Sequence, residues 1–171
     1  RQVLMEAQRQ GKIVVLASGR PTQGVAPLAR ELELEKYGSY ILSYNGGMIT
    51  NCRTGKTVAA ALLPPEINRK VIGLAREQQV NILTYEKDTI ITLKKKDPYV
   101  ELEARINQME IKEISDMENY VEFAVPKFLM VDDGDYLAMV EPRVKAALGR
   151  DFSVYRSDPF FLEILPKGID K

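Results

Sequence analysis

The chain has 171 residues, 45% of them hydrophobic, with 24 basic and 24 acidic residues that give a formal net charge of zero. This length can bury one good core or two small ones, and the balanced charge gives no electrostatic reason to expect nucleic acid or a membrane as partner. The absence of histidine and the single cysteine, Cys52, exclude an internal disulfide, Ser-His-Asp triads and most zinc chemistry. No apolar run is long enough to cross a bilayer, and we expect a protein of the reducing cytoplasm.

The first expected elements are a helix over residues 1–10 and a strand over residues 13–17. The helix places Val3, Leu4 and Ala7 on one apolar side. The five consecutive apolar residues from Ile13 to Ala17 are too few for a helix. They predict a strand that is covered on both faces.

A helix over residues 22–33, a strand over 40–44 and a hairpin of residues 48–50 and 57–60 are expected next. The apolar positions of the helix, which we expect to be buried, are Val25, Leu28, Ala29 and Leu32. Because a helix separates the first two strands, they are expected to be parallel and joined by a right-handed crossover.

After Pro64-Pro65, the order helix, strand, strand occurs twice. The first copy comprises a helix over 66–79 and strands over 81–85 and 89–94; the second comprises a helix over 136–148 and strands over 152–156 and 160–165. Between the copies we expect a helix over about 99–109, a short helix near 118–123 and a strand over 127–131. By itself this order indicates only a generic α+β domain.

The end of the strand at residues 13–17 has the composition of an anion-binding turn. Ser18 offers a hydroxyl and a backbone N–H, Gly19 allows a close approach to the backbone, and Pro21 suits the first turn of a helix. Ligands of open α/β sheets bind at the carboxyl ends of strands, and phosphate is the natural occupant of such a turn. The alternative is an ordinary strand-to-helix turn whose serine caps the helix.

Three segments of the sequence occur in an order that is typical of one enzyme family. They are Ser18-Gly19-Arg20-Pro21, Tyr44-Asn45-Gly46-Gly47, and Leu162-Glu163-Ile164 followed by Lys171. Together they resemble the second motif, a following Tyr-Asn-Gly segment and the third-motif lysine of the haloacid dehalogenase-like phosphatases, specifically the Cof-type sugar-phosphate phosphatases. The resemblance covers nearly the whole chain.

This resemblance implies an α/β fold: a partial Rossmann-like core with a parallel sheet, and a large α+β cap domain built from two αββ units. It divides the chain into core residues 1–64, cap residues 65–165, and residues 166–171, which return to the core. Helix order alone would not have identified the second part as a cap.

The resemblance also implies a magnesium-dependent phosphatase that hydrolyses small phosphate monoesters, above all sugar phosphates, through an aspartyl-phosphate. Its partner is therefore a small phosphorylated metabolite, and the oligomeric state stays open. The implied phosphate-binding residues are Ser18, Gly19 and Lys171, of which Lys171 is also catalytic; the implied substrate contacts are Arg20, Asn45 and Gly46. Lys167 is a rival for the lysine, but the family has a variable residue at that position.

Two family motifs are missing from the sequence. The Asp-x-Asp-Gly carboxylates would precede Arg1, and the Gly-Asp-x-x-Asn-Asp motif would follow Lys171. We therefore expect the nucleophile and all metal ligands to lie outside this chain, which would be the inactive central part of a longer protein. Asp132-Asp133-Gly134-Asp135 lies where the family has its cap, so we interpret it as a turn capping the helix at 136 rather than as a substitute.

Alternative interpretations stay open at this point. The protein could be a non-catalytic ligand-binding or regulatory domain that retains the anion site, or a phosphomutase-like relative with the same aspartyl chemistry. Arg20 could pair with Glu31 or Glu33 on the surface, Asn45 could be a turn residue, and Lys171 could be solvated. A nucleotide-dependent oxidoreductase is disfavoured because no Gly-x-Gly-x-x-Gly follows a strand.

Overall fold

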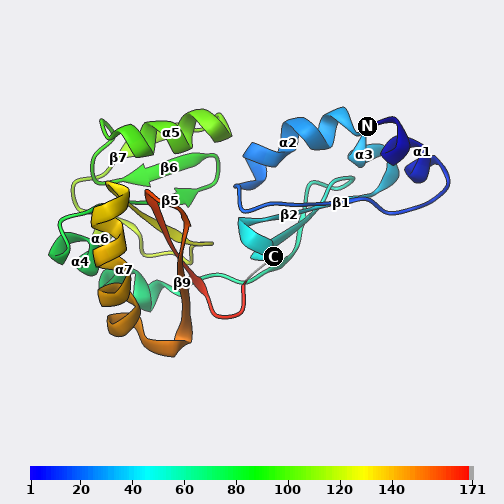
Figure 1. Ribbon diagram of the computed structural model, residues 1–171. Helices are drawn as coiled ribbons and strands as arrows, with labels where there is room; N and C mark the ends of the chain where they lie inside the picture. Colours follow the sequence, from blue (N-terminus) through cyan, green and yellow to red (C-terminus); the bar gives the residue numbers. More distant parts are fainter. Residues whose placement is uncertain (170–171) are drawn as a thin grey trace. The chain divides into compact units, whose positions relative to one another are not determined.

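Residues 1–169 are described by the computed structural model, in which the chain forms two separately packed units (Figure 1). Unit 1 comprises Arg1–Ala61 together with Ile169, and unit 2 is the continuous stretch Leu62–Gly168. Each unit has its own cluster of buried hydrophobic side chains. These limits lie close to those expected from the sequence, while the identification of the units as core and cap stays a prediction.

Unit 1 is a four-stranded sheet with helices packed on it, in the strand order β1-β2-β3-β4. Strands β1 and β2 are parallel, as expected for a strand-helix-strand unit, and β3 and β4 continue the sheet as an antiparallel hairpin. In chain order the elements are α1 (Gln2–Arg9), β1 (Val15–Ala17), α2 (Thr22–Glu31), α3 (Leu34–Tyr37), β2 (Tyr40–Ser43), the 3-10 turn η1 (Tyr44–Gly46), β3 (Met48–Asn51) and β4 (Thr57–Ala60).

The prediction that the first strand is covered on both faces is wrong for the described residues. Val14 and Leu16 pack against the cluster formed by α2, α3 and β2, but Ile13 is 58% exposed and Val15 46% exposed. The reason is that successive side chains of a strand point to opposite faces, and only one face of β1 is covered here. Leu28 of α2, expected in the core, is also exposed.

The fully buried residue of the first helix is polar, although Met5 of α1 also packs against the hydrophobic cluster of unit 1. Val3 and Leu4 are exposed, whereas Gln8 is buried. The Gln8 side-chain amide donates to the Leu32 carbonyl at 2.8 Å and accepts from the Ser39 hydroxyl at 2.9 Å. Because both ends of the amide have partners, its burial carries no large desolvation cost.

Unit 2 is a six-stranded sheet in the order β7-β6-β5-β8-β10-β9. Its elements are α4 (Pro65–Glu77), β5 (Asn81–Glu86), β6 (Thr89–Thr92), α5 (Pro98–Asn107), β7 (Glu110–Glu113), α6 (Met117–Tyr120), β8 (Phe128–Val131), α7 (Gly134–Leu148), the 3-10 turn η2 (Gly149–Asp151), β9 (Phe152–Asp158) and β10 (Phe161–Pro166). The helix-strand-strand order occurs twice, as α4-β5-β6 and α7-β9-β10. Strand β7, parallel to β6 at the sheet edge, was not expected from the sequence.

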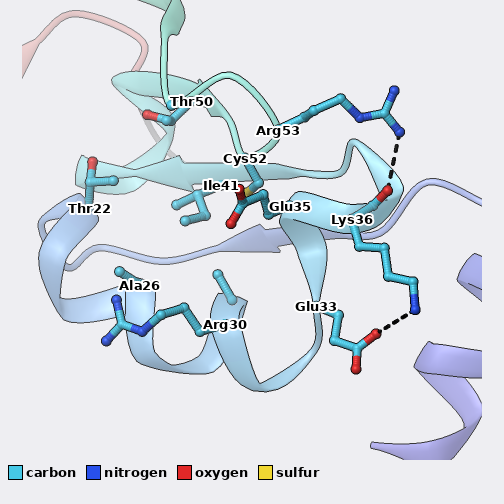
Figure 2. A pocket seen from close by; sticks show the side chains of 12 residues that line it. Thr22, Ala26, Arg30, Glu33, Glu35, Lys36, Ile41, Thr50, Cys52 and Arg53 are labelled. Atoms are coloured by element: carbon cyan, nitrogen blue, oxygen red, sulfur yellow. Dashed lines mark hydrogen bonds and ion pairs between the residues drawn. The ribbon is translucent and has the colours of Figure 1, made fainter.

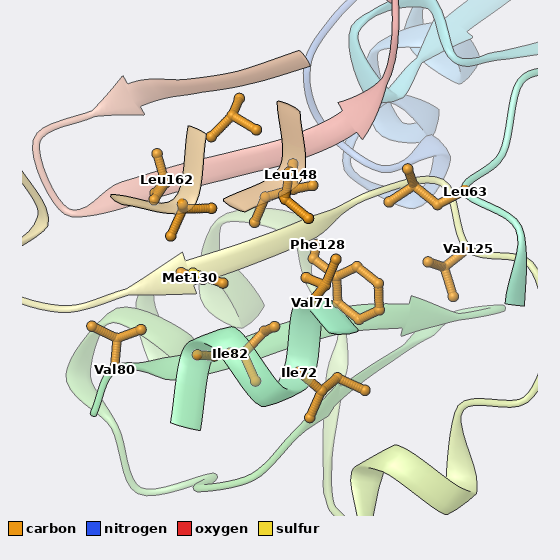
Figure 3. Close-up of a cluster of buried hydrophobic side chains, with 14 of the residues drawn as sticks. Leu63, Val71, Ile72, Val80, Ile82, Val125, Phe128, Met130, Leu148 and Leu162 are labelled. Carbon is orange, nitrogen blue, oxygen red and sulfur yellow. The ribbon is translucent and has the colours of Figure 1, made fainter. Parts of the chain in front are cut away.

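Helices α4 and α7 contribute to one hydrophobic cluster with the central strands of this sheet (Figure 3). Val71 and Ile72 of α4 are fully buried in it, and Leu148 of α7 lies in the same cluster. The strand side chains shown there include Ile82, Phe128, Met130 and Leu162. Paired positions in neighbouring strands share a face, and Ile82, Met130 and Leu162 are successive partners across β5, β8 and β10.

The opposite face of this sheet carries buried polar groups. Glu163 lies between Leu162 and Ile164 of β10, so its side chain points away from their cluster. The ammonium of Lys127 and the carboxylate of Glu163 are 3.2 Å apart, with side chains only 3% and 5% exposed. Such a pair is costly to desolvate, so its members depend strongly on each other.

The acidic turn before α7 is a helix cap, as the sequence predicted, although the helix begins at Gly134 rather than at residue 136. The Asp133 carboxylate accepts from the backbone N–H groups of Asp135 and Tyr136. It thereby satisfies donors that the first turn of a helix leaves unpaired.

Two glycines in helices of unit 2 are expected to respond oppositely to alanine. At Gly134 a Cβ would lie 2.9 Å from the Cβ of Pro159, whereas at Gly73, within α4, it would have no such neighbour among the described residues. Gly134→Ala should therefore destabilise the chain by about 1–3 kcal/mol through overpacking, and Gly73→Ala should stabilise it by up to about 1 kcal/mol. Urea unfolding of both variants tests this, and equal shifts of the same sign would contradict it.

Candidate active site

The candidate site begins where β1 ends. The backbone N–H of Ser18 donates to the Leu42 carbonyl at 2.9 Å, which extends the parallel pairing of β1 with β2 by one residue. The Ser18 hydroxyl oxygen accepts from the N–H of Arg20 at 3.2 Å. The N-cap of α2 is Pro21, with no side-chain capping bond, so the alternative that Ser18 caps this helix is wrong.

The second predicted segment lies directly beside the first. The N–H of Tyr44 donates to the Arg20 carbonyl at 2.9 Å, and the N–H of Asn45 donates to the Ser18 carbonyl at 3.0 Å. The backbone of η1 is left-handed, with φ of 50° at Tyr44, 59° at Asn45 and 92° at Gly46. The fold thus brings five of the six predicted site residues, Ser18 to Arg20 and Asn45 to Gly46, into two adjoining turns.

The exposure of these residues fits an anion site at the surface of unit 1. Ser18, Gly19 and Gly46 are half-buried, and Asn45 is 4% exposed. Arg20 is exposed and, among the described residues, forms no ion pair. The alternative that Arg20 pairs with an acidic residue of α2 or the following turn is not supported, because Glu31 pairs with Arg1 and Glu33 pairs with Lys36.

Only one of the two candidate lysines, Lys167, lies among the described residues. Lys171 lies outside the described residues, so its predicted role stays a prediction. Lys167 lies in unit 2 and is exposed.

The next feature is the distribution of side chains that could bind a metal ion. Within residues 1–169, no three or more Asp, Glu, Cys or His side chains gather in a way that could hold a metal ion. The described residues therefore do not fit a magnesium site. The two adjoining turns contain a hydroxyl, backbone N–H groups and a guanidinium, which are groups that can bind an anion. No helix among the same residues is long and apolar enough to cross a membrane.

A hollow of about 800 Å³ lies elsewhere in unit 1, along α2 and over β2 and β3 (Figure 2). Its lining comprises Thr22, Ala26, Ala29, Arg30, Glu33, Glu35, Lys36, Ile41, Thr50, Cys52, Arg53 and Gly55. None of the predicted site residues is among them. Its lining includes the small residues Ala26, Ala29 and Gly55, which give no distinctive sequence signal, so sequence reasoning missed it.

Three of the charged residues that line this hollow contact one another. The Lys36 ammonium lies 3.3 Å from the Glu33 carboxylate, and the Arg53 guanidinium donates to the Lys36 carbonyl at 3.3 Å (Figure 2). Burial, and then the charge of Glu35, raises the pKa of the Cys52 thiol above its ordinary value. A raised pKa keeps this thiol protonated at neutral pH, which argues against nucleophilic chemistry there.

Comparison with known proteins identifies the family to which this chain belongs. The profile of the haloacid dehalogenase-like hydrolases matches residues 1–171, and the chain belongs to this family. Its mixed α/β fold is the one expected from the sequence.

Two relatives match nearly the whole chain. The chain is 42% identical to a haloacid dehalogenase-like hydrolase from Bacteroides thetaiotaomicron, with a TM-score of 0.92 over 99% of this chain and 64% of that one. A Streptococcus pyogenes protein, whose name assigns it provisionally to the phosphatases, is 28% identical over 99% of this chain and 63% of its own length.

One further structure has a named activity. A sugar phosphatase of HAD subclass IIB is 15% identical, with a TM-score of 0.70 over 99% of this chain and 62% of that chain. At this identity the likeness shows the fold alone. The chain thus spans less than two thirds of the length of each of these three relatives.

Proposed function

We propose that the protein containing residues 1–171 is a phosphatase that hydrolyses small phosphate monoesters, with sugar phosphates as its substrate class. The observation that carries the proposal is the pair of adjoining turns at the end of β1, where the carbonyls of Ser18 and Arg20 accept from the backbone N–H groups of Asn45 and Tyr44. Membership of the haloacid dehalogenase-like family and the names of its relatives support it.

In this proposal each candidate residue has a limited task. The Ser18 hydroxyl and the backbone at Gly19 bind phosphate oxygens, and preorganised donors of this kind matter most as charge develops in the transition state. Lys171 adds a positive charge that pairs with the phosphate and the nucleophile. Arg20, Asn45 and Gly46 border the substrate.

The remaining parts of the reaction are assigned outside this chain. We place the nucleophilic aspartate, which would form an aspartyl-phosphate, and the ligands of a magnesium ion before Arg1 or after Lys171. The ion would neutralise phosphate charge. Unit 1 would be part of the catalytic core, and unit 2 the cap that sets substrate preference.

The test compares the parent protein with residues 1–171 alone. We expect the parent to release phosphate from para-nitrophenyl phosphate and from sugar phosphates, to lose this activity in EDTA, and the 171-residue chain to be inactive. Turnover by the chain alone would contradict the assignment of the nucleophile to other residues. Isomerised hexose phosphate without phosphate release would indicate a phosphomutase, and anion binding without turnover a regulatory domain.

Within the parent, Ser18→Ala should lower kcat about tenfold, because one neutral donor is lost while backbone donors remain. Ser115→Ala is the matched control, since Ser115 is an exposed serine between β7 and α6 of unit 2. An equal effect of both substitutions, or no effect of Ser18→Ala, would show that the Ser18 hydroxyl does not bind the phosphate.

A further inference from the structure

The phosphate contacts proposed at Ser18 and Gly19 lie in a loop whose backbone is hydrogen-bonded at two points to a neighbouring turn. The Ser18 carbonyl accepts from the N–H of Asn45 at 3.0 Å, and the Arg20 carbonyl accepts from the N–H of Tyr44 at 2.9 Å. These bonds join residues more than twenty positions apart. The loop after β1 is therefore hydrogen-bonded to the backbone N–H groups of η1 at two carbonyls.

The bond to the Ser18 carbonyl has a direct consequence for Gly19. In a planar trans peptide the C=O of one residue and the N–H of the next point in opposite directions. Fixing the Ser18 carbonyl toward Asn45 therefore fixes the direction of the Gly19 N–H, which points away from η1. The hydroxyl oxygen of Ser18 accepts a hydrogen bond from the N–H of Arg20 at 3.2 Å.

The donors of η1 lie in a left-handed backbone. Tyr44, Asn45 and Gly46 have φ of 50°, 59° and 92° in succession, a conformation that residues with a Cβ rarely adopt. Tyr44 and Asn45 are each 4% exposed. A run of this kind persists where the surroundings impose it, and such runs concentrate at functional sites.

The far end of the turn is fixed as well. The N–H of Gly47 donates to the Tyr44 carbonyl at 2.9 Å, and a Cβ on Gly47 would lie 3.0 Å from that same oxygen. The turn is thus closed by a hydrogen bond of its own backbone, and a side chain at Gly47 would crowd it.

We infer that the left-handed turn Tyr44–Gly46 is a positioning element that aims the Ser18 hydroxyl and the Gly19 N–H at the phosphate. This inference rests on the proposed function and changes the role expected for Asn45 and Gly46. They act through their backbone on the phosphate contacts rather than by touching the sugar.

Three glycines of unit 1 provide a matched test. Gly46, Gly11 and Gly55 have φ of 92°, 79° and 66°, and at each a Cβ would have no neighbour within 4 Å among the described residues. Gly11 follows α1, and Gly55 lies between β3 and β4. Alanine at any of them adds the same kind of backbone strain without a clash, but only Gly46 belongs to the turn that holds Ser18.

The experiment measures kcat, KM and vanadate inhibition for Gly46→Ala, Gly11→Ala and Gly55→Ala in the parent protein, with hydrogen exchange of the Tyr44 and Asn45 amides. We expect Gly46→Ala to lower kcat/KM and weaken vanadate inhibition about tenfold, since misplaced donors cost that much or more. Both amides should exchange faster in this variant only, while all three lose similar stability.

The outcomes separate the inference from the proposed function. Faster exchange in Gly46→Ala with unchanged kcat/KM and vanadate inhibition would overturn the positioning role, as would equal kinetic losses in all three variants. Unchanged exchange would show that the turn does not depend on Gly46 and would overturn it too. A wild-type parent without phosphatase activity would instead refute the proposed function, while exchange would still report whether Gly46 maintains the bonds to the loop.

Discussion

Lys171→Ala in the parent protein is expected to lower kcat about a hundredfold with little change in KM. A lysine that pairs with the transferring phosphoryl group contributes about 3 kcal/mol more to the transition state than to the bound substrate. This prediction comes from the order of the three sequence motifs, because Lys171 lies outside the described residues. Steady-state kinetics with para-nitrophenyl phosphate measures the effect.

Lys167 supplies the control for this prediction. It is a lysine four positions upstream, exposed on unit 2, and the rival candidate for the same role. Lys167→Ala should leave kcat within about twofold of wild type. If Lys171→Ala also stays within about twofold, or if the loss appears at Lys167 instead, the assignment of the third-motif lysine is wrong.

Lys127→Met is expected to destabilise the chain by about 3–5 kcal/mol, because it leaves the buried Glu163 carboxylate without the ammonium it pairs with. The two charged atoms are 3.2 Å apart, and both side chains are almost completely shielded from water. Urea unfolding of wild type and variant, followed by circular dichroism, measures the change.

Two controls distinguish a buried pair from ordinary charge loss. The double variant Lys127→Met/Glu163→Leu should recover most of the stability, since it removes both charges and keeps apolar volume. Arg69→Met breaks an ion pair with Glu122 in which both side chains are more than half exposed, so it should cost less than about 1 kcal/mol. A loss below that value for Lys127→Met would contradict the importance of the buried pair.

Secondary structure was predictable wherever apolar spacing was strong. The helices at 66–79 and 136–148, and the strands that follow them, were expected and are present with small shifts at their ends. Strand β7 was missed because three of its four residues are charged and exposed, so it shows no apolar alternation. Charged residues are common on edge strands because they discourage further pairing.

Burial was harder to predict than element type. The apolar residues Val3, Leu28 and Val15 have the spacing or composition of core positions, yet they are exposed. Gln8 is buried instead, because two partners distant in sequence, Leu32 and Ser39, satisfy its amide. No local pattern contains such partners, since they are brought together only by the tertiary fold.

The candidate site was predictable in composition but not in geometry. Ser18 and Asn45 were singled out from motifs, and their backbones are hydrogen-bonded to each other. The left-handed run through Tyr44 was not foreseen, because tyrosine rarely adopts that conformation and carries no turn signal. The Lys127–Glu163 pair was missed for a related reason, since charged residues are normally expected at the surface.

The division of the chain also bears on the order in which it folds. Unit 2 is one continuous stretch, whereas unit 1 combines Arg1–Ala61 with Ile169. The ends of both segments of unit 1 lie beside Gly47. The N–H of Ala61 donates to the Gly47 carbonyl at 2.8 Å, and a Cβ built on Gly47 would lie 3.5 Å from the Ile169 side chain. If unit 2 folds first, it replaces a long flexible loop by a preformed insert, and the entropic cost of joining the segments of unit 1 falls accordingly.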